Sequence, residues 1–241
     1  MILADLLQRQ LSDHGIHDLY TIPGDFILPW LGALESGQRQ QAKPLRLIQL
    51  SHEPSAVYAA DAAARWRNAP SAVMLTYGAG ALNAVNAIAQ AYMEFVPLLV
   101  FAGYPSQQEV ASGLLLHHQV SDLDAQRRIL TEVTCGQCRL DDPTTAVQQL
   151  TEVIQRAIAE SRPVLIELPR DMANAQVLCP SLPKMQSGAS DDVNETAIRD
   201  AQHQLDQFCL DLPTKVTTPC LLVGVKAKRF GFDHAVANLA E

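Results

Sequence analysis

The run Pro97-Leu98-Leu99-Val100-Phe101-Ala102 is apolar at every position. A strand with water on one face alternates apolar and polar residues, whereas a strand of a parallel sheet is buried on both faces and is apolar throughout. This segment therefore predicts an interior strand of a parallel sheet that has helices on both sides. A sheet with one solvent-exposed face would not accommodate it.

Apolar strands alternate with amphipathic helices along most of the chain. Alternation at this short spacing predicts an α/β fold with a parallel sheet flanked by helices on both faces. The strands are predicted at 18–22, 45–50, 72–76, 97–102, 132–134 and 163–168, and the helices at 2–13, 25–35, 54–66, 81–92, 126–128 and 142–160.

The C-terminal quarter of the chain has a different organisation. Residues 174–192 are rich in turn-forming residues and predict a linker. A helical pattern at 194–209 and an apolar strand at 219–224 predict the beginning of a second α/β domain, which is incomplete at the end of the chain. We therefore expect a first domain over 1–173 and the start of a second over 193–241.

Composition narrows the classes of partner. The 241 residues carry a formal net charge of −8 and contain no run of lysine or arginine, which excludes a nucleic-acid surface. No apolar stretch is long enough to predict a membrane span. Of the five cysteines, Cys135 and Cys138 form a lone C-x-x-C without the second pair that a zinc ribbon needs. We expect ordinary structural cysteines in a reduced, cytoplasmic protein.

Glu53 lies where an apolar strand meets an alanine-rich helix. Pro54, directly after it, is compatible with the first helical turn, so Glu53 is fixed at the carboxyl end of a strand, where open α/β sheets bind ligands. A carboxyl group among alanine and aliphatic side chains should be poorly solvated, and its pKa should rise until it can share a proton near neutral pH. The alternative is a carboxylate that caps the helix.

Three motifs accompany Glu53. Pro23-Gly24-Asp25 precedes it, Gly78-Ala79-Gly80 follows it, and His117-His118 comes further on. With Glu53 placed before Tyr58-Ala59-Ala60-Asp61, this order and spacing resemble the N-terminal, pyrimidine-binding domain of thiamine-diphosphate enzymes. The resemblance is strongest to the non-oxidative 2-oxo-acid decarboxylases, which include pyruvate, indolepyruvate and phenylpyruvate decarboxylases.

The resemblance, which covers residues 5–172 and resumes weakly at 218–241, implies specific roles. Glu53 would hydrogen-bond the pyrimidine ring of thiamine diphosphate and favour its imino tautomer, and Asp25 would handle a proton at the substrate end of the cleft. His117 and His118 would organise the substrate pocket and its proton relay, with the two side chains pointing to opposite sides of an extended loop. Besides Glu53, the implied cofactor-binding residues are Pro23, Gly24, Tyr77, Gly78 and Asn86.

Each of these residues also has a structural interpretation. Asp25 could cap the following helix. The histidines could be a solvent-exposed loop pair, or two ligands of a metal with Asp122 or Asp124 as a weak third, although we predict no metal ligand in this chain. Glu94 matches an acidic position of the family near a subunit interface, but it could equally be a surface carboxylate.

Another motif imitates a nucleotide site. Gly78-x-Gly80 resembles a dinucleotide fingerprint, but Asn83 stands where the third glycine belongs, and no acidic residue follows at a suitable strand end. We therefore reject a nicotinamide site. The glycines are better explained by close approach of the backbone to the pyrimidine ring and by packing of helix on strand.

The resemblance implies an enzyme that converts a 2-oxo acid into an aldehyde and CO2. The family binds the diphosphate through Mg2+ with a Gly-Asp-Gly motif and a later Asn-Asn, and neither occurs here. We therefore expect this chain to be the N-terminal part of a longer enzyme, or else one of two polypeptides that together form the site, and to be inactive alone. A second copy or a partner chain that carries the diphosphate-binding domain would complete the site in a homo-oligomer. Ala81 and residues 119–125 depart from the family pattern, so pyruvate is a poor candidate substrate. The alternatives are an acetolactate-synthase-like carboligase, against which His117-His118 argues, and a catalytically silent binding or regulatory subunit.

Overall fold

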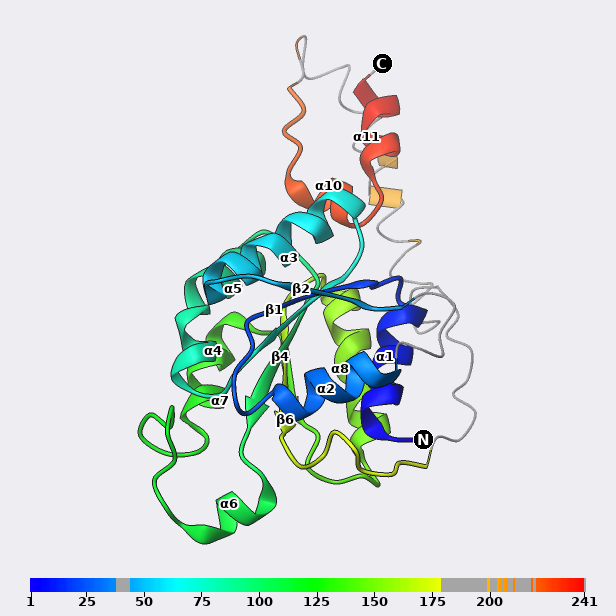
Figure 1. The fold of residues 1–241 in the computed structure, drawn as a ribbon. Coiled ribbons are helices and arrows are strands. Elements are labelled where there is room, and N and C mark those ends of the chain that lie inside the picture. The colour runs from blue at the N-terminus through cyan, green and yellow to red at the C-terminus, as the bar shows by residue number, and fades with distance from the viewer. Residues whose placement is uncertain are drawn as a thin grey trace. The chain divides into compact units, whose positions relative to one another are not determined.

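The computed structural model describes residues 1–37, 44–178, 199, 203–204, 206–207, 210, 218 and 220–240. The chain divides into two compact units, residues 1–180 and 181–241 (Figure 1). Each unit is described by itself.

A six-stranded parallel sheet forms the centre of the first unit, as predicted. Strand β4 lies in its interior and is buried at every position, which explains its uninterrupted apolar sequence. The strands follow the order β2-β1-β3-β4-β6-β5, with β1 at Asp18–Thr21, β2 at Arg46–Gln49, β3 at Ser71–Leu75, β4 at Leu98–Tyr104, β5 at Gly136–Arg139 and β6 at Val164–Pro169.

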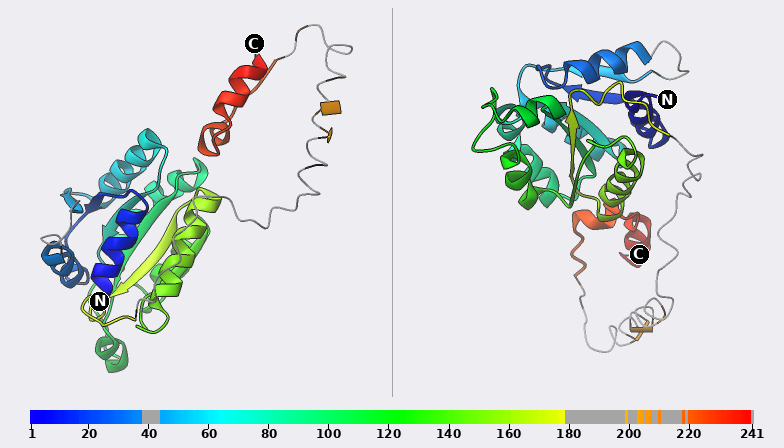
Figure 2. Two further views of the ribbon diagram at one scale, coloured as in Figure 1. Left: turned by 90° about the vertical axis from the view of Figure 1, so that its right-hand side faces the viewer. Right: turned by 90° about the horizontal axis from the view of Figure 1, so that it is seen from below.

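Helices cover both faces of this sheet (Figures 1 and 2). One face carries α3 (Glu53–Arg67), α4 (Ala79–Asn83) and α5 (Val85–Met93), while α1 (Leu3–Asp13) and α8 (Ala146–Glu160) lie on the other, and α2 (Leu28–Gly37) packs beside α1. The buried alanines of α3 recur every fourth residue, so a stripe of small side chains faces the sheet: Ala56, Ala60 and Ala64.

The chain changes direction around β1, and this positions the site. From β1 the connection through α2 leads to β2 on one side, whereas β3 pairs with β1 on the other side. The carboxyl ends of β1 and β3 are held together because the Thr21 hydroxyl donates to the Met74 carbonyl at 2.8 Å. Open α/β sheets bind ligands at such a reversal, beyond the carboxyl ends of the strands.

Four predicted elements of the first unit differ from the structure. The helix predicted at 142–160 begins only at Ala146, because the Asp142 carbonyl first accepts from the N–H groups of Thr145 and Ala146 and closes a turn. The helix predicted at 25–35 begins only at Leu28, because the Gly24 carbonyl accepts from the N–H groups of Ile27 and Leu28 and closes a turn first. The helix predicted at 81–92 is divided at Ala84 into α4 and α5.

The fourth difference concerns residues 125–139. The strand predicted at 132–134 is wrong: α7 (Ala125–Leu130) continues into a 3-10 helix, η2 (Thr131–Val133), and β5 follows. Leu130 and Val133 pack on one core at helical spacing while Ile129 is exposed, which favours the helix. A short helix, α6 (Gln107–Ser112), lies in the loop after β4 (Figure 1).

The first residues of the predicted linker belong to the first unit. The N–H of Leu3 donates to the Ala175 carbonyl at 2.9 Å and that of Val177 to the Met1 carbonyl at 3.0 Å, so residues 174–178 pair with the N-terminal residues. Residues 179–192 lie outside the described residues, and the division of the chain into domains stays a prediction.

In the second unit the structure describes α10 (Val225–Arg229) and α11 (Asp233–Ala240), and its described residues at 199, 203–204, 206–207 and 210 are also helical. Residues 220–224 form no strand, contrary to the prediction at 219–224; an apolar run becomes a strand only when a neighbour pairs with it, and Leu222 is 95% exposed. Most of the predicted helix at 194–209 lies outside the described residues. Among the helices that the structure describes, none combines the length and apolar character needed to cross a bilayer.

Candidate functional site

The sequence motifs meet at one edge of the sheet because they follow the carboxyl ends of parallel strands. Pro23-Gly24-Asp25 follows β1, Glu53 follows β2, and the segment from Thr76 to Gly80 follows β3. His117 and His118 follow β4 after the loop that contains α6. The fold therefore gathers residues that are distant in sequence at the edge where ligands bind in such sheets.

Glu53 is the first residue of α3, and Pro54 stands in the first turn as predicted. The Glu53 side chain is half-buried, and its Oε2 accepts from the Asn83 amide at 2.8 Å rather than from an N–H of its own helix. Its Oε1 has no hydrogen-bond partner in the described part of the chain and faces Gly80, 3.8 Å from where a Cβ on that glycine would lie. One carboxylate oxygen of Glu53 thus remains available to a ligand.

Asn83 is a site residue that sequence reasoning missed. It was considered only as a replacement for a third glycine, yet it lies three residues after Gly80 in α4 and reaches Glu53. Residues three apart in a helix share a face, and that spacing was the available signal.

Thr76 joins the Asp25 turn to the Glu53 side of the site. A Cβ on Gly24 would lie 2.5 Å from the Thr76 Cβ, and a Cβ on Gly80 would lie 2.4 Å from its Cγ2. Neither approach is possible for a residue with a side chain unless Thr76 moves. The Thr76 hydroxyl is buried and forms no hydrogen bond with the described residues.

Asp25 and His117 form the shortest link between two of the predicted catalytic residues. Asp25 lies in the exposed turn before α2, so it does not cap that helix, and its Oδ2 accepts from His117 Nε2 at 2.8 Å. The hydrogen bond from its own backbone N–H lowers the pKa of the Asp25 carboxyl, and the bond from His117 lowers it further. The turn after β1 therefore presents an ionised carboxylate to an imidazole.

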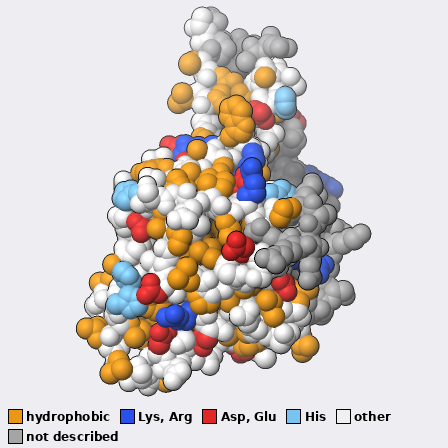
Figure 3. Space-filling view, viewed as in Figure 1, with side chains coloured by type: hydrophobic (Ala, Val, Ile, Leu, Met, Phe, Trp, Pro, Cys, Tyr) orange, Lys and Arg blue, Asp and Glu red, His pale blue; other side chains and the backbone are white. Residues whose placement is uncertain are grey.

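The prediction that the two histidine side chains point to opposite sides of an extended loop is wrong. Their ring centroids are 4.9 Å apart, and Figure 3 shows histidine side chains gathered beside acidic ones on this face. The reason is the backbone: His118 has φ +65°, a left-handed conformation that reverses the chain, and its carbonyl accepts from the Ala79 N–H at 3.0 Å. The Phe26 ring lies 5.0 Å from that of His117.

The other predicted cofactor-binding residues have unequal access to this edge. Pro23 is exposed and Gly24 is half-buried next to Asp25. The Tyr77 side chain is buried between aromatic rings, and its hydroxyl donates to a backbone carbonyl, so only its backbone remains for a ligand. Gly78 has φ +61° and leaves no space for a Cβ. Asn86 donates to the Tyr58 hydroxyl at 3.3 Å.

The remaining acidic candidates are engaged by arginines. Asp122 pairs with Arg128, whose hydrogen bonds lower the pKa of the Asp122 carboxyl to about 2. Asp124 pairs with Arg139, and Glu94 pairs with Arg65. Among the described residues, no group of three or more His, Cys, Asp or Glu side chains is arranged to hold a metal ion.

Comparison with known proteins agrees with the motifs. Residues 1–127 match the family model described as thiamine pyrophosphate enzyme, N-terminal TPP binding domain. The chain belongs to this family, and the resemblance noted in the sequence is confirmed.

Two relatives illustrate how much of such a protein the chain covers. It is 42% identical over 241 residues to the indole-3-pyruvate decarboxylase of Azospirillum brasilense, covering all of this chain and 42% of that protein. It is 29% identical over 243 residues to a probable pyruvate decarboxylase of Schizosaccharomyces pombe, again over the whole chain and 41% of the relative. The chain thus spans about two fifths of the length of these relatives.

A solved structure supports the fold. The thiamine diphosphate-dependent 4-hydroxybenzoylformate decarboxylase of Rhodococcus jostii RHA1 superposes with a TM-score of 0.70 over 86% of this chain and 38% of that protein. The sequence identity is 17%, so this likeness concerns the fold alone.

Proposed function

We propose that this chain is the pyrimidine-binding part of a thiamine-diphosphate-dependent, non-oxidative decarboxylase that converts a 2-oxo acid into an aldehyde and CO2. The observation that carries the proposal is the hydrogen bond from His117 to Asp25, at the sheet edge that also bears the free oxygen of Glu53. A carboxylate with an available oxygen suits a nitrogen heterocycle, and a carboxylate–imidazole pair suits a proton relay.

The residues present fit the pyrimidine end of the cofactor. Glu53 Oε1 is an acceptor without a partner among the described residues, and the buried Thr76 hydroxyl likewise has none. Glu53 would hold the pyrimidine ring through a shared proton, while Asn83 fixes the carboxylate through Oε2. Thiamine diphosphate supplies a carbon nucleophile for the 2-oxo acid and an electron sink for decarboxylation.

Asp25 and His117 would serve the substrate end. The carboxylate is kept ionised by its own N–H and by His117, so it can accept a proton from the imidazole and later return it. His118 would shape the pocket, because its ring lies against that of His117. Both histidines are exposed, which leaves them accessible to a substrate from outside this domain.

The site of this chain would be completed by another polypeptide segment. Two open cavities of about 640 and 520 Å3 lie elsewhere on the first unit, and neither is lined by Glu53, Asp25 or the histidines. The candidate residues form an edge rather than an enclosed pocket. We propose that the diphosphate is bound through Mg2+ by a second copy or a partner chain that carries a diphosphate-binding domain. A homo-oligomer and a cytoplasmic location stay predictions.

Calorimetric titration tests cofactor binding. Thiamine diphosphate with Mg2+ would be titrated into this chain alone and into this chain mixed with a polypeptide that carries the diphosphate-binding part. We expect binding only in the mixture, with loss of that binding in Glu53→Gln. Glu35→Gln makes the same chemical change at an exposed position of α2 and should bind like the unmodified chain. No binding in any mixture would favour the silent-subunit alternative.

Product analysis then tests the reaction. The reconstituted protein would be supplied with aromatic and aliphatic 2-oxo acids, and CO2 and aldehyde would be measured together. Equal amounts of the two products would support the decarboxylase, and His117→Ala should reduce both. Release of CO2 with a 2-hydroxy-ketone or acetohydroxy acid in place of the aldehyde would identify a carboligase.

A further inference from the structure

Glu167, on strand β6, is a carboxylate with no exposed surface. A buried charge is stable only when it is paired and hydrogen-bonded. Its Oε1 accepts from Gln126 Nε2 at 3.0 Å, and its Oε2 accepts from Arg139 Nε at 2.8 Å. Burial raises the pKa of the Glu167 carboxyl, and the Arg139 guanidinium opposes that rise. The proposed reaction uses none of these three groups, so their burial needs another explanation.

Gln126 connects this carboxylate to the site. Its side chain is 1% exposed, and because a carboxylate can only accept, its Nε2 must face Glu167 and its Oε1 must face away. That Oε1 accepts from the Gly78 N–H at 2.8 Å. The buried carboxylate therefore fixes an amide, and the amide fixes the backbone turn between β3 and α4.

The same turn holds the segment that returns from the histidines, residues 118–126, which we call the returning arm. The Ala79 N–H donates to the His118 carbonyl at 3.0 Å, and the Tyr77 hydroxyl donates to the Leu123 carbonyl at 3.0 Å. With the bond from Gly78 to Gln126, three successive residues after β3 each hold a different point of the returning arm.

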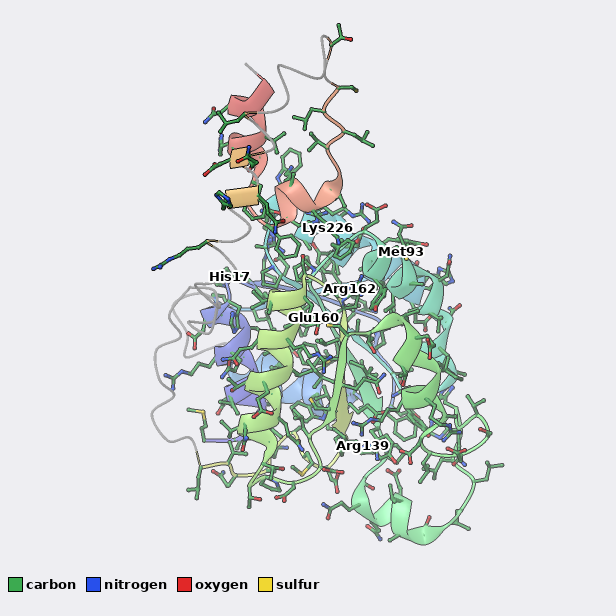
Figure 4. The ribbon with its side chains drawn as sticks, turned by 180° about the vertical axis from the view of Figure 1, so that it is seen from behind. His17, Met93, Arg139, Glu160, Arg162 and Lys226 are labelled. Atoms are coloured by element: carbon green, nitrogen blue, oxygen red, sulfur yellow. The ribbon has the colours of Figure 1, made fainter. Side chains whose placement is uncertain are left out.

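Arg139 supplies a fourth attachment. Besides Glu167 it pairs with Asp124 in the returning arm, and its guanidinium carbon lies 3.7 Å from the centroid of the Tyr104 ring. Figure 4 shows Arg139 at the end of the sheet nearest the α6 segment.

The outgoing side of the loop is held differently, by polar contacts near its start: Gln107 bonds to Asp171 and to the Asp141 carbonyl, and Glu109 pairs with Arg170. No residue of α6 is buried, and none of residues 111–117 is buried.

We propose that Gln126, Glu167 and Arg139 are positioning residues that lock the returning arm to the turn after β3 and thereby hold His117 within hydrogen-bond distance of Asp25. The catalytic importance of this lock rests on the proposed function, in which the Asp25–His117 pair handles a proton. The lock itself is a property of the described residues and can be tested without the reaction.

Hydrogen exchange in the full chain, followed by NMR, measures the lock directly. In Gln126→Leu the acceptor for the Gly78 N–H is lost, and we expect the amides of Gly78 and Ala79 to exchange about tenfold faster or more, while those of α8 keep their rates. Glu167→Gln should act in the same direction, because a neutral amide there no longer dictates which way Gln126 faces. The matched control is Gln8→Leu, which removes a buried glutamine from α1 on the other face of the sheet.

A second readout reports on positioning rather than on packing. The imidazole 15N shifts of His117 would be recorded with Asp25 and with Asn at that position, in the unmodified chain and in Gln126→Leu. The substitution Asp25→Asn should change these shifts strongly in the unmodified chain and in Gln8→Leu. In Gln126→Leu the shift change caused by Asp25→Asn should fall to less than about half of its size in the unmodified chain. The reason is that the hydrogen bond from His117 to Asp25 is then already weakened before Asp25 is replaced.

Two results would overturn the lock. One is unchanged exchange at Gly78 and Ala79 together with an unchanged His117 response in Gln126→Leu. The other is faster exchange throughout α8 as well, which would mark a general loss of stability rather than a local attachment. If the exchange and shift results hold but no 2-oxo acid is decarboxylated, the lock stands and the proposed function fails. If decarboxylation is found but both readouts are unchanged, the lock fails alone.

Discussion

His117 Nε2 donates to Asp25 Oδ2 across 2.8 Å, and this bond joins the turn after β1 to the loop after β4. The two side chains are each more than half exposed, with fractions of 55% and 59%. An exposed pair adds little to stability because solvent screens it. Its value is positional: it places a proton donor and a carboxylate at one point of the sheet edge.

Replacing His117 by alanine should raise the pKa of the Asp25 carboxyl. The bond from its own backbone N–H remains, so the pKa should return only part of the way to its ordinary value. A lowered carboxyl pKa stabilises the folded chain above the unfolded value, and that stabilisation is lost as the pH falls through the folded one. The pH range over which the folded chain loses this stabilisation should therefore move to slightly higher pH in His117→Ala.

A carbon-detected NMR titration of the Asp25 carboxyl measures this shift. His17→Ala is the matched control, since His17 precedes β1 at the opposite end of the strand. An Asp25 pKa that is identical in His117→Ala and the unmodified chain would mean that the pair does not form in solution.

Gly80 should not tolerate alanine. A Cβ there would lie 2.4 Å from Thr76 Cγ2, and the cost of such overpacking is about 1–3 kcal/mol of unfolding free energy. Gly32 in α2 meets nothing within 4 Å, so Gly32→Ala should instead stabilise by about 0.5–1 kcal/mol through helix propensity. Urea unfolding with an unchanged slope separates the two variants. Equal midpoints for them would contradict the close packing of Gly80 on Thr76.

The fold could be predicted because its signals are local. The uninterrupted apolar run of β4 requires burial on both faces, and Pro54 fixes the start of α3 directly after a strand. The 3-10 helix at Thr131–Val133 could not be predicted in this way. Its short apolar run fits both a strand and a helix, and the packing of Leu130 and Val133 on one core decides between them.

The site could be predicted only in part, for a related reason. Glu53 was proposed because it follows a strand and precedes a helix, whereas the roles proposed for Asp25 and His117 came from the resemblance of their motifs to the family. The role of Thr76 depends on distances across the sheet edge, which no spacing along the chain encodes. Asn83 shares a helix face with Gly80, but that spacing does not by itself show that the Asn83 amide reaches Glu53. The two histidine rings lie close together because His118 has a left-handed backbone conformation, which no sequence pattern here predicts.

The lone C-x-x-C should be chemically quiet. Burial raises the pKa of Cys135 to about 11 and that of Cys138 to about 12, so almost no thiolate is present at pH 8. Cys220, which is exposed, should react with iodoacetamide at least about a hundredfold faster than either. The difference in alkylation rate between Cys220 and the two buried cysteines should become smaller as the pH rises. It should disappear in denaturant, because unfolding exposes all three thiols.

Peptide mapping by mass spectrometry after timed alkylation follows each cysteine separately, with Cys220→Ser as the control for assignment. Because the folded pKa values are raised, the stability that these buried thiols contribute is present below the ordinary thiol pKa and is lost as the pH rises toward 11 and 12. Alkylation of Cys138 as fast as that of Cys220 at pH 8 would refute the burial of β5 against α8. A disulfide between Cys135 and Cys138 under mild oxidant would do the same, since a low thiolate population makes both steps of disulfide formation slow.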